Sequence, residues 1–329
     1  SWHVEIWINF GWLIFGLTLL YFGAEWLVRG SSEIALKVGL SPLVVGLTVV
    51  AFGTSAPELL VSLQANLKTP PQGDIALGNI VGSNICNIAL ILGVGALIRP
   101  IVVNLQVVRR EMPILLFVSI VFVAMLWDGT IVRWEGAILA AGIVAYVVAS
   151  IRMAKRESQP PGQFDEMMED ELAAIKQGGA RRIVLDVGLI LVGLAVLVYG
   201  ADRMVESGVA LARIFSVSEA IIALTLIAFG TSLPELATSV VASIKNQGDI
   251  ITGNAIGSCI FNILAVIGIA SVVAPISASQ LNRVDLWVML GLTILIIPIL
   301  ATGRRLSRTE GLLLLASYLG YCVYLVQRA

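Results

Sequence analysis

The chain has 329 residues, of which 58% are hydrophobic and only 13% are charged, and its formal net charge is −1. This composition is too apolar for a set of ordinary soluble domains and is typical of a membrane protein. Lys and Arg form no cluster large enough to follow a phosphate backbone, which excludes nucleic acid as a partner.

Apolar segments long enough to cross a bilayer recur along nearly the whole chain. We predict an all-α membrane protein with ten transmembrane helices, at residues 4–28, 41–67, 74–98, 110–127, 133–151, 183–203, 217–244, 249–274, 285–302 and 310–327. No small-residue cleavage site follows the first segment, so we expect a helix there rather than a removed signal. The polar stretch 152–182 contains Pro160-Pro161 and an acidic run, and we predict a linker with one short amphipathic helix.

Basic residues are divided unequally between the two sides when the loops are assigned to them alternately. One side receives fifteen of the 21 Lys and Arg residues, including Arg99, Lys245 and those of the linker, and the other side receives six. Because loops rich in Lys and Arg stay in the cytoplasm, we predict extracellular termini, a cytoplasmic linker and a multi-pass protein of the cell membrane.

The sequence contains an internal repeat. The first copy of the main motif, Ala51-Phe52-Gly53-Thr54-Ser55 with Pro57-Glu58-Leu59, matches Ala228-Phe229-Gly230-Thr231-Ser232 with Pro234-Glu235-Leu236. After a two-residue slip in the loop at Thr69-Pro70-Pro71, the match continues from Gln72-Gly73-Asp74 with Gln247-Gly248-Asp249 to Asn87-Ile88 with Asn262-Ile263. Each copy holds five spans, an odd number, so the second must enter the membrane from the opposite face. We predict two inverted five-helix repeats, residues 1–151 and 183–329, joined by the linker 152–182, an architecture typical of secondary transporters.

Each copy places a proline and a glutamate in the middle of a predicted span. Pro57 and Pro234 have no N–H, so each removes a helical hydrogen bond to the carbonyl four residues earlier and should break the helix. Backbone freed at this depth is tolerated where it lines a cavity or meets an ion. Glu58 and Glu235 follow at the start of the next half-helix, where the helix dipole favours a carboxylate.

A bound cation would remove the cost of burying these carboxylates, since one charged side chain at the bilayer centre costs about 2.5–3.5 kcal/mol. Calcium takes about 6–8 oxygen ligands, and the repeats supply carboxylates, hydroxyl groups and free carbonyls, whereas magnesium dehydrates less readily. The neighbouring helix of each copy carries a polar stripe at four-residue spacing, made of Asn79, Ser83 and Asn87 and of Asn254, Ser258 and Asn262. Small residues should let this helix approach closely, Gly78 with Gly82 and Gly253 with Gly257.

Two motifs, each present twice, resemble the signature repeats of sodium/calcium exchangers in the cation/calcium exchanger superfamily: Gly53-Thr54-Ser55-Ala56-Pro57-Glu58 and Gly78-Asn79-Ile80-Val81-Gly82-Ser83-Asn84. The resemblance covers all ten predicted spans, and the short linker is similar to that of compact prokaryotic members. It implies ions between the second, third, seventh and eighth helices, with the first and sixth helices sliding. It also implies calcium ligands at Glu58, Glu235 and the carbonyls of Thr54 and Thr231, sodium ligands at Ala51, Ser55, Ser83, Ala228, Ser232 and Ser258, and a central position completed by Asn87 and Asn262.

Two residues depart from the pattern. Some relatives, including potassium-dependent exchangers, carry Asp at the position of Asn262, so this chain has two core carboxylates and potassium cotransport is disfavoured. Cys259 stands where the first copy has Asn84, so the halves are not chemically identical. Glu25 and Asp202 are equivalent in the repeat, and either a salt bridge or a contact with water remains open for them.

We therefore expect a secondary antiporter, not an enzyme, that exchanges sodium for calcium by alternating access at a shared midplane site. Its partners would be the bilayer and the two ions, with no cofactor and no obligate protein partner. An empty site would leave two glutamates uncompensated, which should enforce exchange.

Other functions remain as alternatives. A calcium/proton antiporter typically shows Gly-Asn-x-x-Glu where this chain has Gly-Thr-Ser-x-Pro-Glu, and a potassium-dependent sodium/calcium antiporter is a further possibility. An intramembrane aspartyl protease would need a Gly-x-Gly-Asp motif, which the sequence lacks. An ion channel would be recognised by a flux far faster than a transport cycle.

Overall fold

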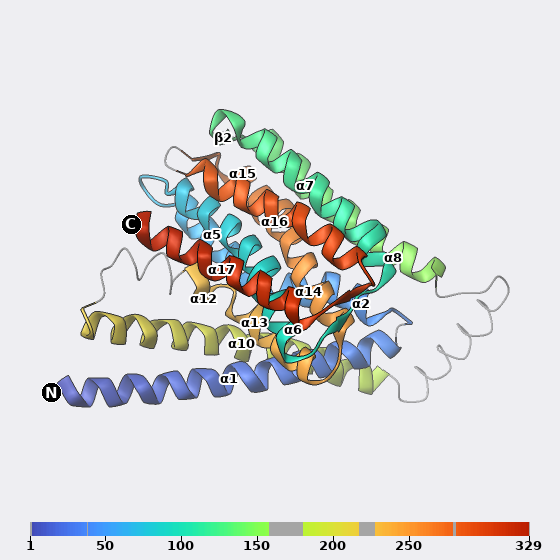
Figure 1. The fold of residues 1–329 in the computed structure, drawn as a ribbon, viewed down its shortest axis with the longest axis horizontal. Coiled ribbons are helices and arrows are strands. Elements are labelled where there is room, and N and C mark those ends of the chain that lie inside the picture. The colour runs from blue at the N-terminus through green and yellow to red at the C-terminus, as the bar shows by residue number, and fades with distance from the viewer. Residues whose placement is uncertain (1, 38, 158–179, 217–227, 279–280, 329) are drawn as a thin grey trace.

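The computed structural model describes residues 2–37, 39–157, 180–216, 228–278 and 281–328, which are mostly helical (Figure 1). Its first half contains α1 (Trp2–Lys37), α2 (Pro42–Val45), η1 (Gly46–Val50), α3 (Ala51–Thr54), α4 (Ala56–Asn66), α5 (Gly73–Ile85), η2 (Cys86–Ile91), α6 (Leu92–Ile98), β1 (Ile101–Val102), η3 (Val107–Glu111), α7 (Met112–Met125), η4 (Leu126–Asp128), β2 (Thr130–Ile131) and α8 (Arg133–Glu157). Its second half contains α10 (Ala180–Ile214), α12 (Ala228–Gly230), α13 (Leu233–Ile244), α14 (Gly248–Phe261), η7 (Asn262–Ile267), α15 (Gly268–Val273), β3 (Ile276–Ser277), α16 (Arg283–Ala301), β4 (Arg305–Leu306) and α17 (Arg308–Arg328).

Eight helices in the described part of the chain are long and apolar enough to cross a membrane. A further candidate is a bent pair, Pro42–Thr54 and Ala56–Asn66, whose two parts meet at 40°. All of these lie on predicted spans. The predicted span 217–244 falls partly outside the described residues, which contain its final part as the apolar helix α13. This series of apolar helices is that of a multi-pass membrane protein.

Helices α1 and α10 lie side by side as a long pair along one edge of the molecule (Figure 1). Their backbones approach closely at glycines: a Cβ atom at Gly16 would lie 2.9 Å from the Gly200 carbonyl oxygen, and one at Gly23 would lie 2.8 Å from that of Gly193. As the residue number of the contact increases along α1, from Gly16 to Gly23, it decreases along α10, from Gly200 to Gly193. The two helices are therefore antiparallel. Small residues therefore allow this interface to be dense.

Both of these helices are longer than predicted. The spans 4–28 and 183–203 were limited by polar residues, but α1 continues to Lys37 and α10 to Ile214. The extension of α1 packs along the start of α10, where Lys37 forms an ion pair with Asp186. Helices α8 and α10 likewise extend into the two ends of the predicted linker 152–182. The short helix predicted within that linker lies outside the described residues.

Two short antiparallel strand pairs join segments from the two halves of the chain. In one, Ile101 of β1 lies opposite Leu306 of β4, and in the other, Ile131 of β2 lies opposite Ile276 of β3. The repeat relation that matches Asn87 with Asn262 maps β1 onto β3 and β2 onto β4 in the same register. These strands were not predicted, because two residues are too few to show a strand pattern.

The bent pair Pro42–Thr54 and Ala56–Asn66 is the first broken helix. Helix α14 packs directly on its first part through glycines. A Cβ atom at Gly253 would lie 2.8 Å from the Leu43 carbonyl oxygen, and one at Gly257 would lie 2.7 Å from that of Leu47. The close approach predicted for the second copy is therefore confirmed. For Gly78 and Gly82 the equivalent neighbours fall within 217–227, outside the described residues.

Candidate functional site

The backbone breaks at the same point of both repeated motifs. Ser55 stands between α3 and α4 with φ −83° and ψ 5°, and Ser232 precedes α13 with φ −90° and ψ 4°. Both conformations lie in the bridge region, outside that of a regular α-helix. Pro57 and Pro234 occupy the first turn of the next helix, where a missing N–H costs no helical hydrogen bond. The predicted breaks are thus confirmed.

The two glutamates that follow these breaks are fully buried, each 0% exposed. The Ser83 hydroxyl donates to Glu58 Oε1 at 3.1 Å, and the Ser55 hydroxyl donates to Glu235 Oε1 at 3.3 Å. Ser83 is also 3.1 Å from the Ser232 hydroxyl. Both carboxylates lie in the first turn of their half-helices, where the positive end of the dipole stabilises them. The structure therefore brings residues of both halves together around the glutamates.

Several buried side-chain atoms of the predicted ligands have no hydrogen-bond partner among the described residues. The oxygens are Glu58 Oε2, Asn87 Oδ1, Glu235 Oε2, Ser258 Oγ and Asn262 Oδ1. An unsatisfied buried polar group costs about 1–3 kcal/mol, so such a set requires an explanation. Carboxylate, amide and hydroxyl oxygens are the ligands that hard cations prefer in proteins. The donor set thus fits a cation of the kind predicted from the sequence.

The two central asparagines differ in the hydrogen bonds of their carboxamides. Asn262 Nδ2 donates to Asn84 Oδ1 at 2.9 Å and to the Ser83 hydroxyl at 3.2 Å. The second copy has Cys259 in place of Asn84, and a thiol cannot replace the amide oxygen as a strong acceptor. Neither polar atom of the Asn87 carboxamide has a hydrogen-bond partner in the described part of the chain. Asn87 is therefore the freer of the two central asparagines, and Cys259 accounts for one of the two bonds that it lacks.

Asn79 links α4, the helix that carries Glu58, to the second half of the chain. Its Nδ2 donates to the backbone carbonyl of Glu58 at 3.3 Å and to the Ser62 hydroxyl at 3.2 Å. Its Oδ1 accepts from the Thr231 hydroxyl at 3.1 Å. The side chain is almost completely buried, so these bonds are shielded from water.

Asn254 forms the equivalent set of bonds in the other direction. Its Nδ2 donates to the backbone carbonyl of Glu235 at 3.4 Å and to the Ser239 hydroxyl at 3.5 Å, and its Oδ1 accepts from the Thr54 hydroxyl at 3.0 Å. In the sequence, Asn79 and Asn254 are recognisable only as members of the polar stripes. Their spacing alone does not show which polar groups they meet.

Each of the remaining predicted ligands lies in a short helical segment of the repeated motifs. Ala51 begins α3 and is fully buried, with its Cβ facing Gly257. Ala228 begins α12, but its side chain lies outside the described residues. Asn87 and Asn262 lie in the π-helical segments η2 and η7, which the sequence did not predict. Such segments occur frequently at functional sites.

The equivalent acids Glu25 and Asp202 have different partners. Glu25 forms an ion pair with Lys245, which caps the end of α13. Asp202 is paired with its neighbour Arg203 at 3.0 Å. The salt-bridge alternative is thus confirmed for Glu25, while Asp202, among the described residues, forms a local and more exposed pair.

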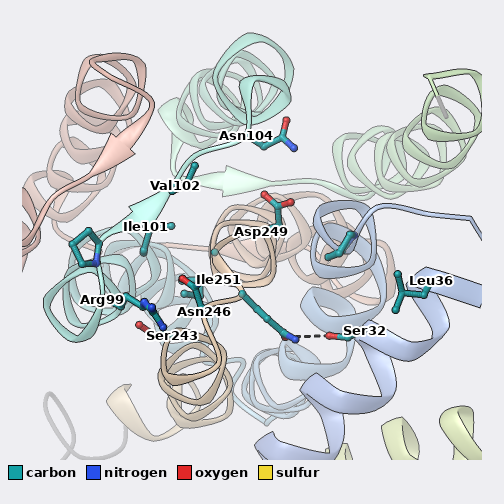
Figure 2. A pocket seen from close by; sticks show the side chains of 14 residues that line it. Ser32, Leu36, Arg99, Ile101, Val102, Asn104, Ser243, Asn246, Asp249 and Ile251 are labelled. Atoms are coloured by element: carbon teal, nitrogen blue, oxygen red, sulfur yellow. Dashed lines mark hydrogen bonds between the residues drawn. The ribbon is translucent and has the colours of Figure 1, made fainter.

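A cavity of about 560 Å³ lies between α1, the segment after α6 and the start of α14 (Figure 2). Polar groups line it, including Arg99, Asn104 and Asp249. Gln247, which also lines the cavity, accepts a hydrogen bond from the Ser32 hydroxyl at 3.1 Å. Among the described residues, no predicted ion ligand lines this cavity, so it is separate from the glutamate site.

Apolar spanning helices around two buried glutamates at helix breaks are the construction of membrane ion transporters. The sequence profile of the sodium/calcium exchanger protein family matches residues 8–152 and 185–327. The chain therefore belongs to the sodium/calcium exchanger family.

Similarity to individual members extends over most of the chain. The inner membrane protein YrbG of Escherichia coli is 41% identical over 265 residues, covering 80% of this chain and 79% of that protein. The sodium/calcium exchanger MaX1 of Methanosarcina acetivorans is 30% identical over 346 residues, covering 97% and 98%. A solved structure of the sodium-calcium exchanger NCX_Mj, soaked with 10 mM Na+ and no Ca2+, aligns with a TM-score of 0.81 at 30% identity, covering 95% and 97%. The helical membrane fold is thus shared with a known exchanger.

Proposed function

We propose that this protein is a secondary antiporter that exchanges sodium for calcium by alternating access, with Glu58 and Glu235 at the centre of the shared site. The observation that carries the proposal is the set of buried oxygens without partners on these glutamates and on neighbouring predicted ligands, within the part of the chain that the structure describes. Family membership and the similarity to sodium/calcium exchangers over nearly their whole length support it.

The proposed ligands come from both halves of the chain. Calcium would be bound by the two glutamates and the backbone carbonyls of Thr54 and Thr231, and sodium would add ligands from Ala51, Ser55, Ser83, Ala228, Ser232 and Ser258, with Asn87 and Asn262 at the centre. Calcium requires about 6–8 oxygens, which this set can supply. The ions are the cargo of the protein, and its surroundings are the lipid bilayer; we propose no cofactor and no obligate protein partner.

The proposed architecture is ten spans in two inverted repeats, residues 1–151 and 183–329. Two broken helices with the same backbone geometry and two strand pairs in the same register, at equivalent positions of the halves, support the repeat. The odd number of spans per repeat supports the inversion. The distribution of Lys and Arg favours the cell membrane, with both termini outside and the linker 152–182 in the cytoplasm.

The proposed function is tested by calcium-45 uptake into vesicles that contain the purified protein and are loaded with sodium. We expect uptake that requires an outward sodium gradient and stops when the gradient is removed. A flux that follows pH and ignores sodium would instead identify a calcium/proton antiporter, and a flux far faster than a transport cycle would identify a channel.

Potassium should have no effect on this exchange, because the site contains two core carboxylates and Asn262 supplies an amide at the position of the third. Replacing choline by potassium on either side of the vesicle membrane should leave the rate of sodium-driven calcium uptake unchanged. A requirement for potassium would show that the neutral side chain of Asn262 does not decide the ion specificity.

The ion pair between Glu25 and Lys245 should exchange for a second pair during the transport cycle. Under the repeat relation that matches Glu58 with Glu235, Glu25 corresponds to Asp202 and Lys245 corresponds to Lys68. In the structure α1 packs against α13 next to this pair, whereas α10 makes no comparable contact with α4 among the described residues. Inverted repeats that alternate should reverse this difference, so that Lys68 pairs with Asp202 in the opposite access state.

Disulfide crosslinking between cysteines introduced at these positions would measure the exchange. Glu25→Cys with Lys245→Cys should trap one state and Lys68→Cys with Asp202→Cys the other; each pair should block transport until it is reduced. Because these pairs are partly exposed, Lys245→Ala should shift the balance of the two states only modestly, by up to about fivefold. Simultaneous crosslinking of both pairs in one molecule would contradict the proposed alternation.

A further inference from the structure

Asn79 and Asn254 differ from the central asparagines in how their carboxamides are used. The Oδ1 atoms of Asn87 and Asn262 have no hydrogen-bond partner in the described part of the chain, so they can contact an ion. In Asn79 and Asn254, by contrast, Nδ2 has two acceptors and Oδ1 has a donor. Because their polar groups are already used within the protein, these two side chains are suited to hold other groups in place rather than to bind ions.

Each asparagine bonds twice within its own half of the chain and once to a threonine of the other half. Asn254 joins the Thr54 hydroxyl, just before the first break, to the backbone of Glu235, just after the second. The next residue, Ser55, donates to the carboxylate of the same glutamate at 3.3 Å. Two consecutive residues of the first half therefore fix Glu235, one through its backbone and the other through its carboxylate.

We infer that Asn79 and Asn254 are positioning residues that fix each glutamate helix to the Thr-Ser turn of the opposite half, and so couple the two halves of the ion site. This inference rests on the proposed function of that site. Without the bond, the link between the backbone of a glutamate and the turn that faces it is lost, and the ligands contributed by the two halves are held less firmly at one spacing.

The mildest test removes a hydroxyl without changing the proposed carbonyl ligand. Thr54→Val has nearly the same shape as the wild-type residue but cannot donate to Asn254, nor to the Val50 carbonyl one turn earlier, which the Thr54 hydroxyl also meets at 3.0 Å. We expect the calcium concentration for half-maximal uptake to rise about tenfold, with a smaller change in the maximal rate, because about one buried hydrogen bond is lost. Thr54→Ser, which keeps the hydroxyl, should restore the wild-type value.

Further variants separate positioning from a general effect on the fold. The double variant Thr54→Val with Asn254→Ala should be hardly weaker than Asn254→Ala alone, because both changes remove the same link. Thr293→Val is a matched control: Thr293 is buried, and its hydroxyl donates to the Met289 carbonyl of its own helix, at 2.9 Å. This control should leave the half-maximal calcium concentration unchanged.

Equilibrium binding of calcium-45 to the purified variants gives the same comparison without transport, and retains a readout if Asn254→Ala does not assemble. Wild-type calcium affinity in Thr54→Val, equal weakening in Thr293→Val, or additive effects in the double variant would each overturn the inference. Absence of sodium-driven calcium flux in the wild-type protein would instead refute the proposed function. The two failures are therefore distinguishable.

Discussion

Glu58→Gln and Glu235→Gln should each abolish sodium-driven calcium uptake. The amide has almost the shape of the carboxylate but lacks its charge, and both side chains are fully buried, so water cannot substitute for the lost ligand. Removing one partner from a buried set of charges costs about 3–5 kcal/mol, which corresponds to a loss of calcium affinity of at least about 100-fold. Calcium-45 uptake by vesicles containing each variant measures this directly.

Glu33→Gln provides the control for this pair of variants. Glu33 lies on α1, its side chain is 49% exposed, and it is 3.8 Å from Lys37 in a surface ion pair. Such pairs contribute little, so this change should leave uptake close to that of the wild type. Undiminished uptake by Glu58→Gln or Glu235→Gln would remove the glutamates from the proposed ion site.

Gly257→Ala should weaken the protein and severely reduce its transport, although it adds only one methyl group. The new Cβ would lie 2.7 Å from the Leu47 carbonyl oxygen and 2.8 Å from the Ala51 Cβ, so α14 and the first broken helix must move apart. Overpacking of this kind costs about 1–3 kcal/mol. The melting temperature in detergent and the uptake of calcium-45 should therefore both fall.

The same substitution at an open position serves as the comparison. Gly320 lies on an exposed part of α17, and a Cβ there would meet no atom within 4 Å in the described part of the chain. Gly320→Ala should therefore be neutral or slightly stabilising, because alanine favours the helix. Equal behaviour of the two variants would show that the contact between α14 and the broken helix is not tight.

Features that depend on local sequence could be predicted. The apolar segments gave the spans because their length is set by the bilayer, and Pro57 and Pro234 gave the breaks because proline lacks an N–H. The prediction of a loop at the polar residues between Arg29 and Lys37 was wrong. Hydropathy does not show that α10 packs against this end of α1 and supplies Asp186 as the partner of Lys37. Residues 158–179 and 217–227 lie outside the described part of the chain.

Features that depend on pairing between distant residues could not be predicted. Asn79 and Asn87 lie on one stripe in the sequence, and nothing in the spacing distinguishes them. Only the structure shows that the Asn79 carboxamide is fully hydrogen-bonded, whereas that of Asn87 has no partner among the described residues. The bond between Asn84 and Asn262 joins positions far apart in the sequence, and its absence in the other half could not be inferred from Cys259 without that geometry. The π-helical segments have no distinct sequence pattern, so they were missed as well.

The proposed repeat relates the contact surface of α1 to the contact surface of α10, so that the two helices meet through equivalent residues. The relation that matches Glu58 with Glu235 turns the approach of Gly16 to Gly200 into that of Gly193 to Gly23, which is the other close approach of the same interface. This is the property of an isologous interface in a two-fold symmetric dimer, where one surface meets a second copy of itself. A single ancestral half with this helix would already carry the surface needed to assemble with an inverted copy of itself.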